Sequence, residues 1–391
     1  MPKKIVIIAG EESGDYHASS FVRLLKQQNP DWKFSGIGGR HLQRAGMKLL
    51  FNLSAYGVTG ITEVFRYFFI IKKAFNLIIN HIKTENPDLI ILVDYPGFNL
   101  RLAKRIRRFS LTPILYYIAP QIWAWKPKRL KTIQKYISHM AVILPFEKEL
   151  YQQAEVPVSF VGHPIIRQLE EKMKSLLDKQ SLGLPDNKIL VAMLPGSRRN
   201  EIKRLLPVFI ETIKQFQQED DSIHFVIPVA KSLNFDYVKS LLPGNLPVSL
   251  VYGHAIDVMM LSEAVVVASG TASLECALLG RPSCLVYKIS AATYSAATQL
   301  VRIPYIGLAN ILSGKMIMPE LIQDDCEPTS LSNMVHFLVY DEAFRENQVE
   351  QFNALYSTLS STAADCTIES IIDNLLPDPQ EYEVDKNTEK V

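Results

Sequence analysis

The chain has 391 residues, of which 48% are hydrophobic and 21% are charged, and its formal net charge is +2. These values suit two ordinary folded domains, and they argue against a largely disordered chain and a general affinity for nucleic acid. A disulfide framework and a metal site are also disfavoured, because no CxxC pair occurs among Cys276, Cys284, Cys326 and Cys366. No segment reaches the roughly 20 apolar residues of a spanning helix, and "MPKK" runs into a strand without a signal segment. We therefore expect a cytoplasmic protein.

Short apolar runs alternate with amphipathic stretches, which is the pattern of parallel strands covered by helices. The first series is "KIVIIA", "WKFSGIG", "DLIILVD", "PILYYIA", "HMAVIL" and "VSFVG". The second series, "KILVAMLPG", "IHFVIPVA", "VSLVYG", "EAVVVASG" and "PSCLVYKI", begins after the polar segment "EKMKSLLDKQSLGLPDN". We predict two doubly wound, Rossmann-like α/β domains. Ligands of such sheets bind beyond the carboxyl ends of the strands, so polar motifs at strand ends are candidate sites.

The first predicted strand leads into "AGEESGDYHA", residues 9–18, which contains two glycines, three carboxylates and a serine. Glu11, Ser13 and Asp15 are candidates for contacts with sugar hydroxyls, although Asp15 could equally cap its own helix. Further along, "GIGGR" at residues 36–40 begins like a dinucleotide-binding fingerprint, but His41 stands at the third glycine position. Hydride transfer is therefore a poor hypothesis.

Residues 62–82, "TEVFRYFFIIKKAFNLIINHI", have apolar side chains around more than one face of the predicted helix. A single core-facing stripe cannot bury them all. Phe65, Phe68 and Phe69 are candidates for contact with lipid, and the basic segments "RLAKRIRRF" and "WKPKRLKTIQK" suit an anionic membrane surface. A core helix with solvated lysines, or a dimer contact, explains the pattern equally well.

Asp94 follows the buried strand of "LIILVDYPGFNL", where Pro96 and Gly97 turn the chain away. A carboxylate at the mouth of a crevice with low-dielectric walls can be tuned for general-base catalysis. The alternative is a structural role, as a helix cap or as an ion-pair partner for the arginines that follow.

In the second half, "LPGSRRNEI" ends a strand, turns tightly and enters a helix. Amides around Gly196 and Ser197, together with Arg198 or Arg199, fit the oxygens of a diphosphate. Solvated arginines on an ordinary turn are the alternative. The chain contains no DxD triplet to hold a metal-bound diphosphate, so we expect group transfer that needs no metal.

A second motif of the same kind is "EAVVVASGTASLECALLG", in which Ser269, Gly270 and Thr271 form a turn before a helix. Glu275, expected in the first turn of that helix, can accept two hydrogen bonds from the vicinal hydroxyls of a ribose. It could also be only a favourable charge near the positive helix end. Two such turns in one domain favour a nucleotide diphosphate as the ligand.

The motifs "AGEESGD", "GVTGITEVF", "DYPGFNL", "APQIWAWKPKR", "LPFEKELY", "FVGHP", "LPGSRRNEI", "ASGTASLE" and "GLANILSG" together resemble the lipid-A-disaccharide synthase family. The resemblance extends to about residue 376. It implies the two-domain glycosyltransferase B-type (GT-B) fold and no cofactor or metal. The implied reaction joins UDP-2,3-diacylglucosamine to 2,3-diacylglucosamine 1-phosphate (lipid X), releases UDP and forms a β-1,6-linked disaccharide, and we expect inversion at the anomeric carbon. The implied location is the anionic cytosolic face of the inner membrane of a Gram-negative bacterium, with a homodimer as one possible state.

Carried over to this sequence, the resemblance implies that Asp94 is the base for the acceptor 6-hydroxyl, with Glu11 and Ser13 in the same active site. It assigns the diphosphate to Arg198, the ribose to Glu275 and a further donor contact to Asn310 of "GLANIL". Two other classes stay open, a nucleotide-sugar epimerase and a non-catalytic nucleotide-sugar-binding protein. Both share the architecture, and the phenylalanine-rich helix speaks against the epimerase.

The predicted domain limits are residues 1–170 for the acceptor and lipid side and 171–343 for the UDP-sugar side. Residues 344–376 are expected to form C-terminal helices that return to the first domain, and residues 377–391 a flexible tail.

The sequence departs from the family's usual "GEASGD" at Glu12, which replaces the alanine. We expect Glu12 to face solvent, because two carboxylates pointing inward would raise the pKa of one of them. His17 and His163 could join proton transfer, but loop histidines with satisfied hydrogen bonds are more common. Trp123 and Trp125 are expected to pack beneath the basic loop rather than to line a lipid path.

Overall fold

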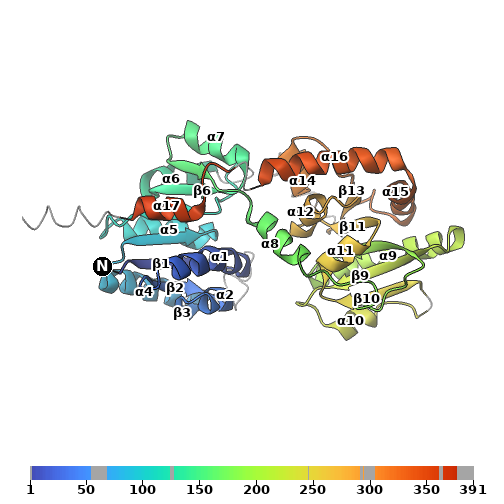
Figure 1. Ribbon diagram of the computed structural model, residues 1–391, viewed down its shortest axis with the longest axis horizontal. Coiled ribbons are helices and arrows are strands. Elements are labelled where there is room, and N and C mark those ends of the chain that lie inside the picture. The colour runs from blue at the N-terminus through green and yellow to red at the C-terminus, as the bar shows by residue number, and fades with distance from the viewer. Residues whose placement is uncertain are drawn as a thin grey trace, which may run out of the picture. The chain divides into compact units, whose positions relative to one another are not determined.

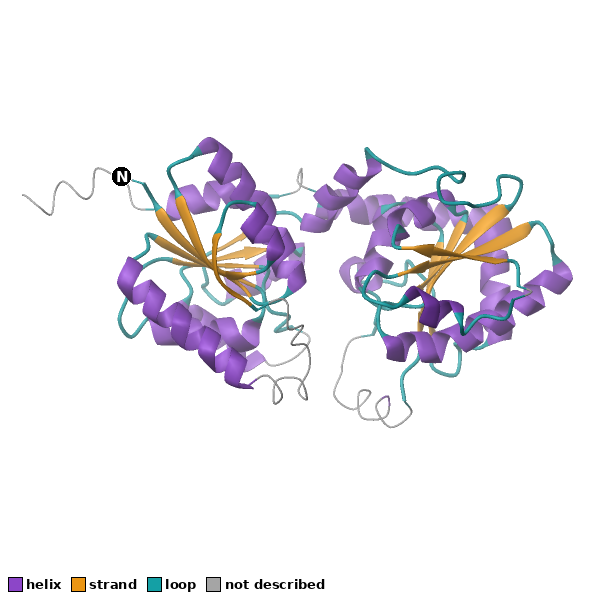
Figure 2. Ribbon diagram, turned by 90° about the horizontal axis from the view of Figure 1, so that it is seen from below, coloured by secondary structure: helices purple, strands orange, loops and turns teal. Residues whose placement is uncertain are grey.

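The computed structural model describes residues 2–53, 68–123, 127–244, 246–290, 294, 304–360 and 364–376. The chain forms two compact units, one of Met1–Pro164 with Ser361–Val391 and the other of Ile165–Ser360. Each unit is a parallel sheet with helices on both faces (Figure 1, Figure 2). The prediction of two doubly wound α/β domains is confirmed.

The first unit has a seven-stranded sheet in the order β3-β2-β1-β4-β5-β6-β7. Its strands are β1 (Lys4–Ala9), β2 (Lys33–Gly38), β3 (Lys48–Asn52), β4 (Leu89–Val93), β5 (Ile114–Tyr117), β6 (His139–Val142) and β7 (Val158–Phe160). Its helices are α1 (Glu12–Gln28), α2 (Arg40–Arg44), α4 (Phe68–Glu85), α5 (Pro96–Ile106), η2 (Pro127–Arg129), α6 (Leu130–Tyr136), α7 (Pro145–Gln153) and α17 (Ile368–Leu375). Every residue of β4 is buried, because helices cover both faces of the sheet, and the strand is therefore continuously apolar.

The second unit has a six-stranded sheet in the order β10-β9-β8-β11-β12-β13. Its strands are β8 (Ile189–Leu194), β9 (Ile223–Val229), β10 (Val248–Tyr252), β11 (Ala264–Ala268), β12 (Ser283–Tyr287) and β13 (Glu320–Ile322). Its helices are α8 (Pro164–Met173), α9 (Arg199–Glu219), α10 (Phe235–Lys239), α11 (Ala255–Leu261), α12 (Thr271–Leu278), α14 (Leu308–Ser313), α15 (Pro328–Tyr340) and α16 (Glu342–Leu359).

In both sheets the strand order reverses beside the first strand, between β1 and β4 and between β8 and β11. The paired strands end level with each other, since Ala9 is opposite Val93 and Leu194 is opposite Val267. Loops that leave such a point diverge to opposite faces of the sheet and open a crevice between them. The four loops that follow these strands contain most of the predicted site residues.

The C-terminal helices divide between the units, which corrects the predicted domain limits. Residues 344–359 belong to α16, and this helix packs on the second unit through its buried side chains Phe352, Leu355 and Leu359. Only α17 joins the first unit, where Ile371 and Ile372 enter the core. The helical stretch is interrupted before α17, whose N-cap Thr367 accepts a hydrogen bond from the Ser370 amide. The first boundary lies after Pro164 rather than after residue 170, and the predicted tail lies outside the described residues.

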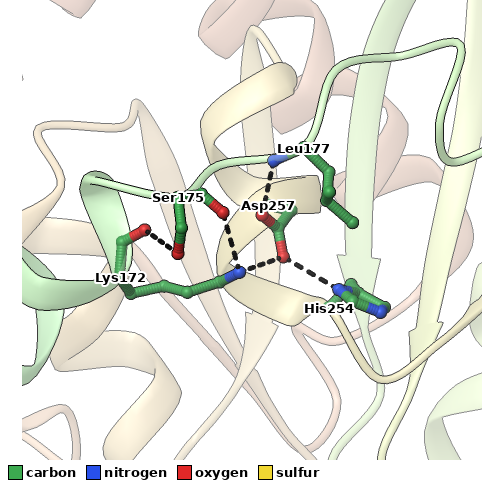
Figure 3. A network of polar contacts seen from close by, with 5 residues as sticks. All are labelled: Lys172, Ser175, Leu177, His254 and Asp257. Carbon is green, nitrogen blue, oxygen red and sulfur yellow. Dashed lines mark hydrogen bonds and ion pairs between the residues drawn. The ribbon is translucent and has the colours of Figure 1, made fainter.

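A buried carboxylate joins the entry segment of the second unit to α11. Asp257 accepts a hydrogen bond from the Leu177 amide at 2.9 Å, and its Oδ2 lies 3.0 Å from Lys172 Nζ and 3.1 Å from His254 Nδ1 (Figure 3). Its side chain is fully buried. Although burial opposes the charged form, these hydrogen bonds lower the pKa of Asp257 below its ordinary value.

Replacing Asp257 by alanine should destabilise the second unit by about 3 kcal/mol, because it removes the charged partner of Lys172 and leaves the Leu177 amide without its acceptor. Urea unfolding at pH 7 measures the difference. Asp178→Ala is the control, since this exposed carboxylate also accepts one amide hydrogen bond, from Ser181. A depressed pKa stabilises the fold fully above the ordinary pKa of the group, so the difference should start to decrease near pH 4 and shrink further as the pH falls through the lowered pKa. Equal unfolding midpoints at pH 7 would contradict this role.

Candidate active site

In the first unit, the loops after β1 and β4 are packed tightly against each other. A Cβ atom at Gly10 would overlap the ring of Tyr95, and one at Gly14 would lie 3.3 Å from Val93 Cγ1. The two glycines of the opening loop therefore let the start of α1 close onto the end of β4. This close packing places Glu11, the N-cap residue of α1, beside the loop that contains Asp94.

Asp94 and Tyr95 form a strained turn at the end of β4. Both have left-handed backbones, with φ of 44° and 46°. Such conformations are unfavourable for residues other than glycine and persist where surrounding contacts hold them. Here the Asp94 carbonyl accepts hydrogen bonds from Asn99 Nδ2 at 2.7 Å and from the Tyr116 hydroxyl at 2.6 Å. Strain held in this way at the mouth of a sheet is typical of functional residues.

The two carboxyl groups of this site influence each other. Burial raises the pKa of Asp94 to about 6, against a hydrogen bond from the Tyr95 amide. Burial, and next the charge of Asp94, raise the pKa of Glu11 to about 7. Near pH 7 Asp94 is therefore largely ionised while Glu11 is about half protonated, and because the two groups interact, they titrate as a pair. Ser13, the third predicted residue, lies exposed in the first turn of α1.

Asp15 has a structural role that the sequence analysis did not predict. Its side chain is buried and accepts hydrogen bonds from the amides of Gly39, His41 and Leu42 at 2.6, 2.9 and 3.2 Å. It therefore caps α2 rather than its own helix, and its oxygens are committed away from sugar hydroxyls. Glu12 is exposed, as predicted.

The nearby histidines are weak bases. Burial lowers the pKa of His17 to about 4, and burial followed by the charge of His17 lowers that of His163 to about 3. Trp123 contacts α7: its Nε1 donates to Glu147 at 3.1 Å, and its ring lies 5.1 Å from that of Phe146. Because residues 124–126 of the basic segment lie outside the described residues, the expected packing beneath that segment stays a prediction. Trp125 lies outside the described residues.

In the second unit, an internal carboxylate occupies part of the predicted diphosphate turn. Glu201 Oε2 accepts hydrogen bonds from the amides of Ser197 at 2.8 Å and Arg198 at 3.1 Å, and Oε1 lies 2.9 Å from Arg198 Nη1. Gly196 has φ of 101° and leaves no room for a Cβ beside this carboxylate. The two amides predicted to bind phosphate are therefore already used. The Arg198 side chain is 73% exposed, so its guanidinium, although paired with Glu201 through Nη1, is open to solvent.

The second turn, after β11, has open space around it. Gly270 has φ of 155° and no atom within 4 Å of where its Cβ would lie, and Thr271 beside it is exposed. Ser269 Oγ donates to the Ile306 carbonyl at 3.5 Å. Glu275 lies in the second turn of α12 rather than the first, so the helix-end charge is a weaker explanation for it. Burial raises the pKa of Glu275, as expected for a carboxylate with no charged partner among the described residues.

Asn310 organises a loop, and its geometry does not support a direct donor contact. Its Nδ2 donates to the Met318 carbonyl at 2.7 Å and to Glu320 at 2.8 Å, while its Oδ1 accepts from the amides of Ile317 and Met318, both at 2.8 Å. These bonds use the full capacity of a buried amide side chain. Glu320 also accepts from the amides of Ile306 and Gly307, so the pair fixes the segment that faces Ser269.

The start of α4 presents unburied aromatic residues. Phe68 is 54% exposed and Phe69 is 82% exposed, and their rings lie 5.8 Å apart. Lys72 and Lys73, one turn further on, are exposed as well. Phe65 lies outside the described residues.

Across the described part of the chain, no helix is both long enough and apolar enough to cross a membrane. The same residues contain no group of three or more side chains that could hold a metal ion.

Several residues that shape the sites escaped the sequence analysis. Glu201 could have been found, because a glutamate three residues after an N-cap is the spacing of a capping box. Asn99 and Tyr116 carried no such signal. Both bind the Asp94 carbonyl, Asn99 from the helix α5 that directly follows the turn and Tyr116 from the neighbouring strand β5, and only the second contact depends on the order of the strands.

Two doubly wound units, each with a candidate site where its strand order reverses, define the GT-B class of protein. A calicheamicin glycosyltransferase has a TM-score of 0.61 and 15% identity, covering 96% of this chain and 98% of that structure. The UDP-N-acetylglucosamine 2-epimerase of Neisseria meningitidis, solved with UDP-N-acetylglucosamine bound, has a TM-score of 0.59 and 12% identity, covering 95% and 99%. At these identities the likeness describes the fold alone.

Sequence relatives identify the family within this class. The model of the lipid-A-disaccharide synthetase family matches residues 5–371. Lipid-A-disaccharide synthase 1 of Legionella pneumophila subsp. pneumophila strain Philadelphia 1 is 45% identical over 376 residues, covering 96% of this chain and 98% of the relative. The synthase of Coxiella burnetii strain CbuG_Q212 is 34% identical, covering 96% and 99%. The chain belongs to the lipid-A-disaccharide synthase family and is a glycosyltransferase, which confirms the resemblance seen in the motifs.

Proposed function

We propose that the protein transfers 2,3-diacylglucosamine from UDP-2,3-diacylglucosamine to 2,3-diacylglucosamine 1-phosphate, with inversion and without a metal or another cofactor. The products are UDP and a β-1,6-linked tetraacyl disaccharide 1-phosphate. The observation that carries the proposal is the Asp94–Glu11 carboxyl pair, held by a strained turn where the strand order of the first unit reverses.

In the proposed mechanism, Asp94 removes the proton of the acceptor 6-hydroxyl as that oxygen attacks the anomeric carbon of the donor. The bond from the anomeric carbon to the diphosphate oxygen breaks on the opposite side, and its electron pair leaves with UDP. Glu11 holds a proton beside Asp94 and can donate a hydrogen bond to a sugar oxygen. Ser13, exposed in the same loop, can make a similar contact.

The second unit is proposed to bind the donor nucleotide. The solvent-exposed guanidinium of Arg198 suits the diphosphate, with Gly196 and Ser197 shaping the turn beneath it. The open space at Gly270, between Ser269 and Thr271, leaves room for the nucleotide, and the half-buried carboxylate of Glu275 can accept from ribose hydroxyls. Asn310 acts on this site only through the loop that it organises.

The direct test is to incubate purified protein with UDP-2,3-diacylglucosamine, with and without the acylated sugar 1-phosphate, in the presence of chelator, and to identify products by mass spectrometry. We expect an acylated disaccharide phosphate and UDP only when the acceptor is present. Loss of activity with chelator would refute metal independence. An isomer of the donor formed without acceptor would favour the epimerase, to which the fold alone is equally similar.

We further propose that the start of α4 attaches the protein to the anionic cytosolic face of the inner membrane. Phe68 and Phe69 supply exposed aromatic rings, and Lys72 and Lys73 supply positive charge one turn away. Burying an aromatic side chain contributes about 2 kcal/mol, and each nearby lysine about 1 kcal/mol. A dimer contact through the same rings is the competing explanation.

Replacing both Phe68 and Phe69 by serine should release the protein from vesicles containing anionic lipid while leaving UDP affinity unchanged. Leu111→Ser is the matched control, because Leu111 is 91% exposed. Leu111 directly precedes β5 and so lies at the amino ends of the parallel strands, whereas α4 begins on the side of their carboxyl ends. Vesicle sedimentation measures binding, and light scattering reports the oligomeric state. If the double variant still sediments with vesicles but changes its mass, the rings form a contact between copies instead.

A further inference from the structure

A buried carboxyl group in the first unit has no part in the mechanism above. Glu147 lies in the first turn of α7 and is 1% exposed. Its Oε1 accepts the hydrogen bond from Trp123 Nε1 at 3.1 Å. Its Oε2 is buried and has no hydrogen-bond partner among the described residues. Burying a carboxylate without a counter-charge costs far more free energy than burying a neutral carboxylic acid.

Helix α7 holds the segment that follows β5, residues 118–123, at several points. Trp123 binds Glu147 and packs against Phe146, which is adjacent in the same turn. Tyr151, one turn further along α7, donates to the Pro120 carbonyl at 3.4 Å. Glu147 and Tyr151 therefore face the same segment from the same side of the helix.

This segment borders the Asp94 turn. Strand β5 pairs with β4, so that Tyr117 lies opposite Val93 and residue 118 begins next to Asp94. The Asp94 amide donates to the Tyr117 carbonyl at 2.9 Å, and the Tyr116 hydroxyl binds the Asp94 carbonyl. A shift of residues 118–123 would therefore be transmitted to Asp94 through Tyr117 and Tyr116, which bind its backbone.

We propose that Glu147 is a positioning residue for the Asp94 site, which holds Trp123 and residues 118–123 in place as a neutral carboxylic acid. The inference rests on the proposed function of Asp94. It adds a residue that contacts neither sugar substrate but fixes the position of residues 118–123, which lie beside the proposed base Asp94.

The charges around Glu147 agree with a neutral acid. Burial raises its pKa to about 8, opposed by the hydrogen bonds from Trp123 and from the Leu144 amide and assisted by the charge of Asp94. Tyr151 faces it from α7, and its pKa is raised by burial and by Glu147. Tyr116 of β5 interacts with Asp94, Tyr151, Arg129 and Glu11. At pH 7 Glu147 is mainly protonated, and above about pH 8 it adds a further buried negative charge near Asp94.

The test compares wild type with Glu147→Gln, which keeps the shape of the side chain and does not titrate. For wild type, transferase activity at pH 9 should be about a tenth of that at pH 7, because the neutral fraction of a group with a pKa of about 8 falls by that factor. Glu147→Gln should lose the transition near pH 8, while any transition near pH 7 belongs to Glu11 and should remain. Glu147→Ala should lower turnover at least tenfold while UDP affinity stays unchanged. A transition near pH 8 that persists in Glu147→Gln would overturn the proposal.

A second readout separates this inference from the proposed reaction. The difference in tryptophan fluorescence between wild type and Trp123→Phe should show a transition near pH 8, and the corresponding difference in a Glu147→Gln background should show none. If wild type forms no disaccharide, the proposed function fails while the fluorescence still tests the contact. Circular dichroism confirms that each variant is folded. If Glu147→Ala is folded and matches wild type in turnover and in Trp123 emission, Glu147 does not position this segment.

Discussion

Asp94→Asn should lower turnover by about 10²–10⁴-fold, the usual contribution of a general base, while UDP affinity stays within about twofold of wild type. The amide cannot accept the acceptor proton, but it has nearly the same shape as the carboxylate. Asparagine is also, with aspartate, the residue other than glycine that best tolerates the left-handed backbone of φ 44° at this position. Alanine would combine the loss of the base with backbone strain and is the poorer choice.

The matched control is Glu12→Gln, which removes one negative charge from the opening loop at an exposed position. Its turnover should be unchanged. Activity is measured by release of UDP at saturating acceptor, and UDP affinity by calorimetry. Retention of more than a tenth of the wild-type turnover by Asp94→Asn would reject Asp94 as the base.

The same assignment predicts the acidic side of the pH profile. A base must be deprotonated to act, so turnover should fall as the pH drops through about 6, the raised pKa of Asp94. Because Glu11 titrates nearby with a pKa of about 7, the observed values belong to the pair.

Arg198→Ala should weaken UDP binding by about 10–100-fold, because a hydrogen bond to a charged group contributes about 1.5–3 kcal/mol. The structure leads us to expect the upper part of this range. Glu201 already occupies the Ser197 and Arg198 amides, so the guanidinium must carry more of the interaction with the diphosphate. Arg198→Lys, which keeps the charge and loses the forked geometry, should give an intermediate affinity.

Arg199→Ala is the control for this experiment, since its guanidinium lies 5.0 Å from the centre of the Tyr237 ring. Its effect on UDP affinity should be much smaller. Titration calorimetry with UDP and with uridine separates the diphosphate from the nucleoside, and uridine binding should not respond to Arg198→Ala. If UDP binds equally well to wild type and Arg198→Ala, the diphosphate does not contact this side chain.

The sequence was most informative where both faces of a strand are buried. Strands such as β1, β4 and β11 are continuously apolar and were all predicted. Strands β3 and β13 were missed, because they are short edge strands whose residues are mostly half-buried and lack a continuous apolar run. The two parts of the last helical stretch were assigned to one domain, since an amphipathic helix does not reveal which core it covers.

The sequence predicted those parts of the site that follow from which residues lie at the ends of neighbouring strands. Glu11 and Asp94 were expected in one site, and the structure brings them together because β1 and β4 are neighbours. Asp15 was left open between a sugar contact and a cap of its own helix, and Asn310 was assigned a donor contact from the family resemblance, because a polar side chain has the same appearance in the sequence whether it binds substrate or backbone. Only the positions of distant amides distinguish these cases.

The first unit is discontinuous in the chain, and this has a consequence for its synthesis. The second unit is one uninterrupted segment, Ile165–Ser360, and contains all of its own core. The first unit also needs residues that are synthesised after the second unit: Ile371 and Ile372 fill its core, and Asp365 accepts hydrogen bonds from the Phe160 amide and from Lys148. The domain made first can therefore complete its folding only after the domain made second has been synthesised, and a nascent chain stopped at residue 360 would leave apolar surface of the first unit uncovered.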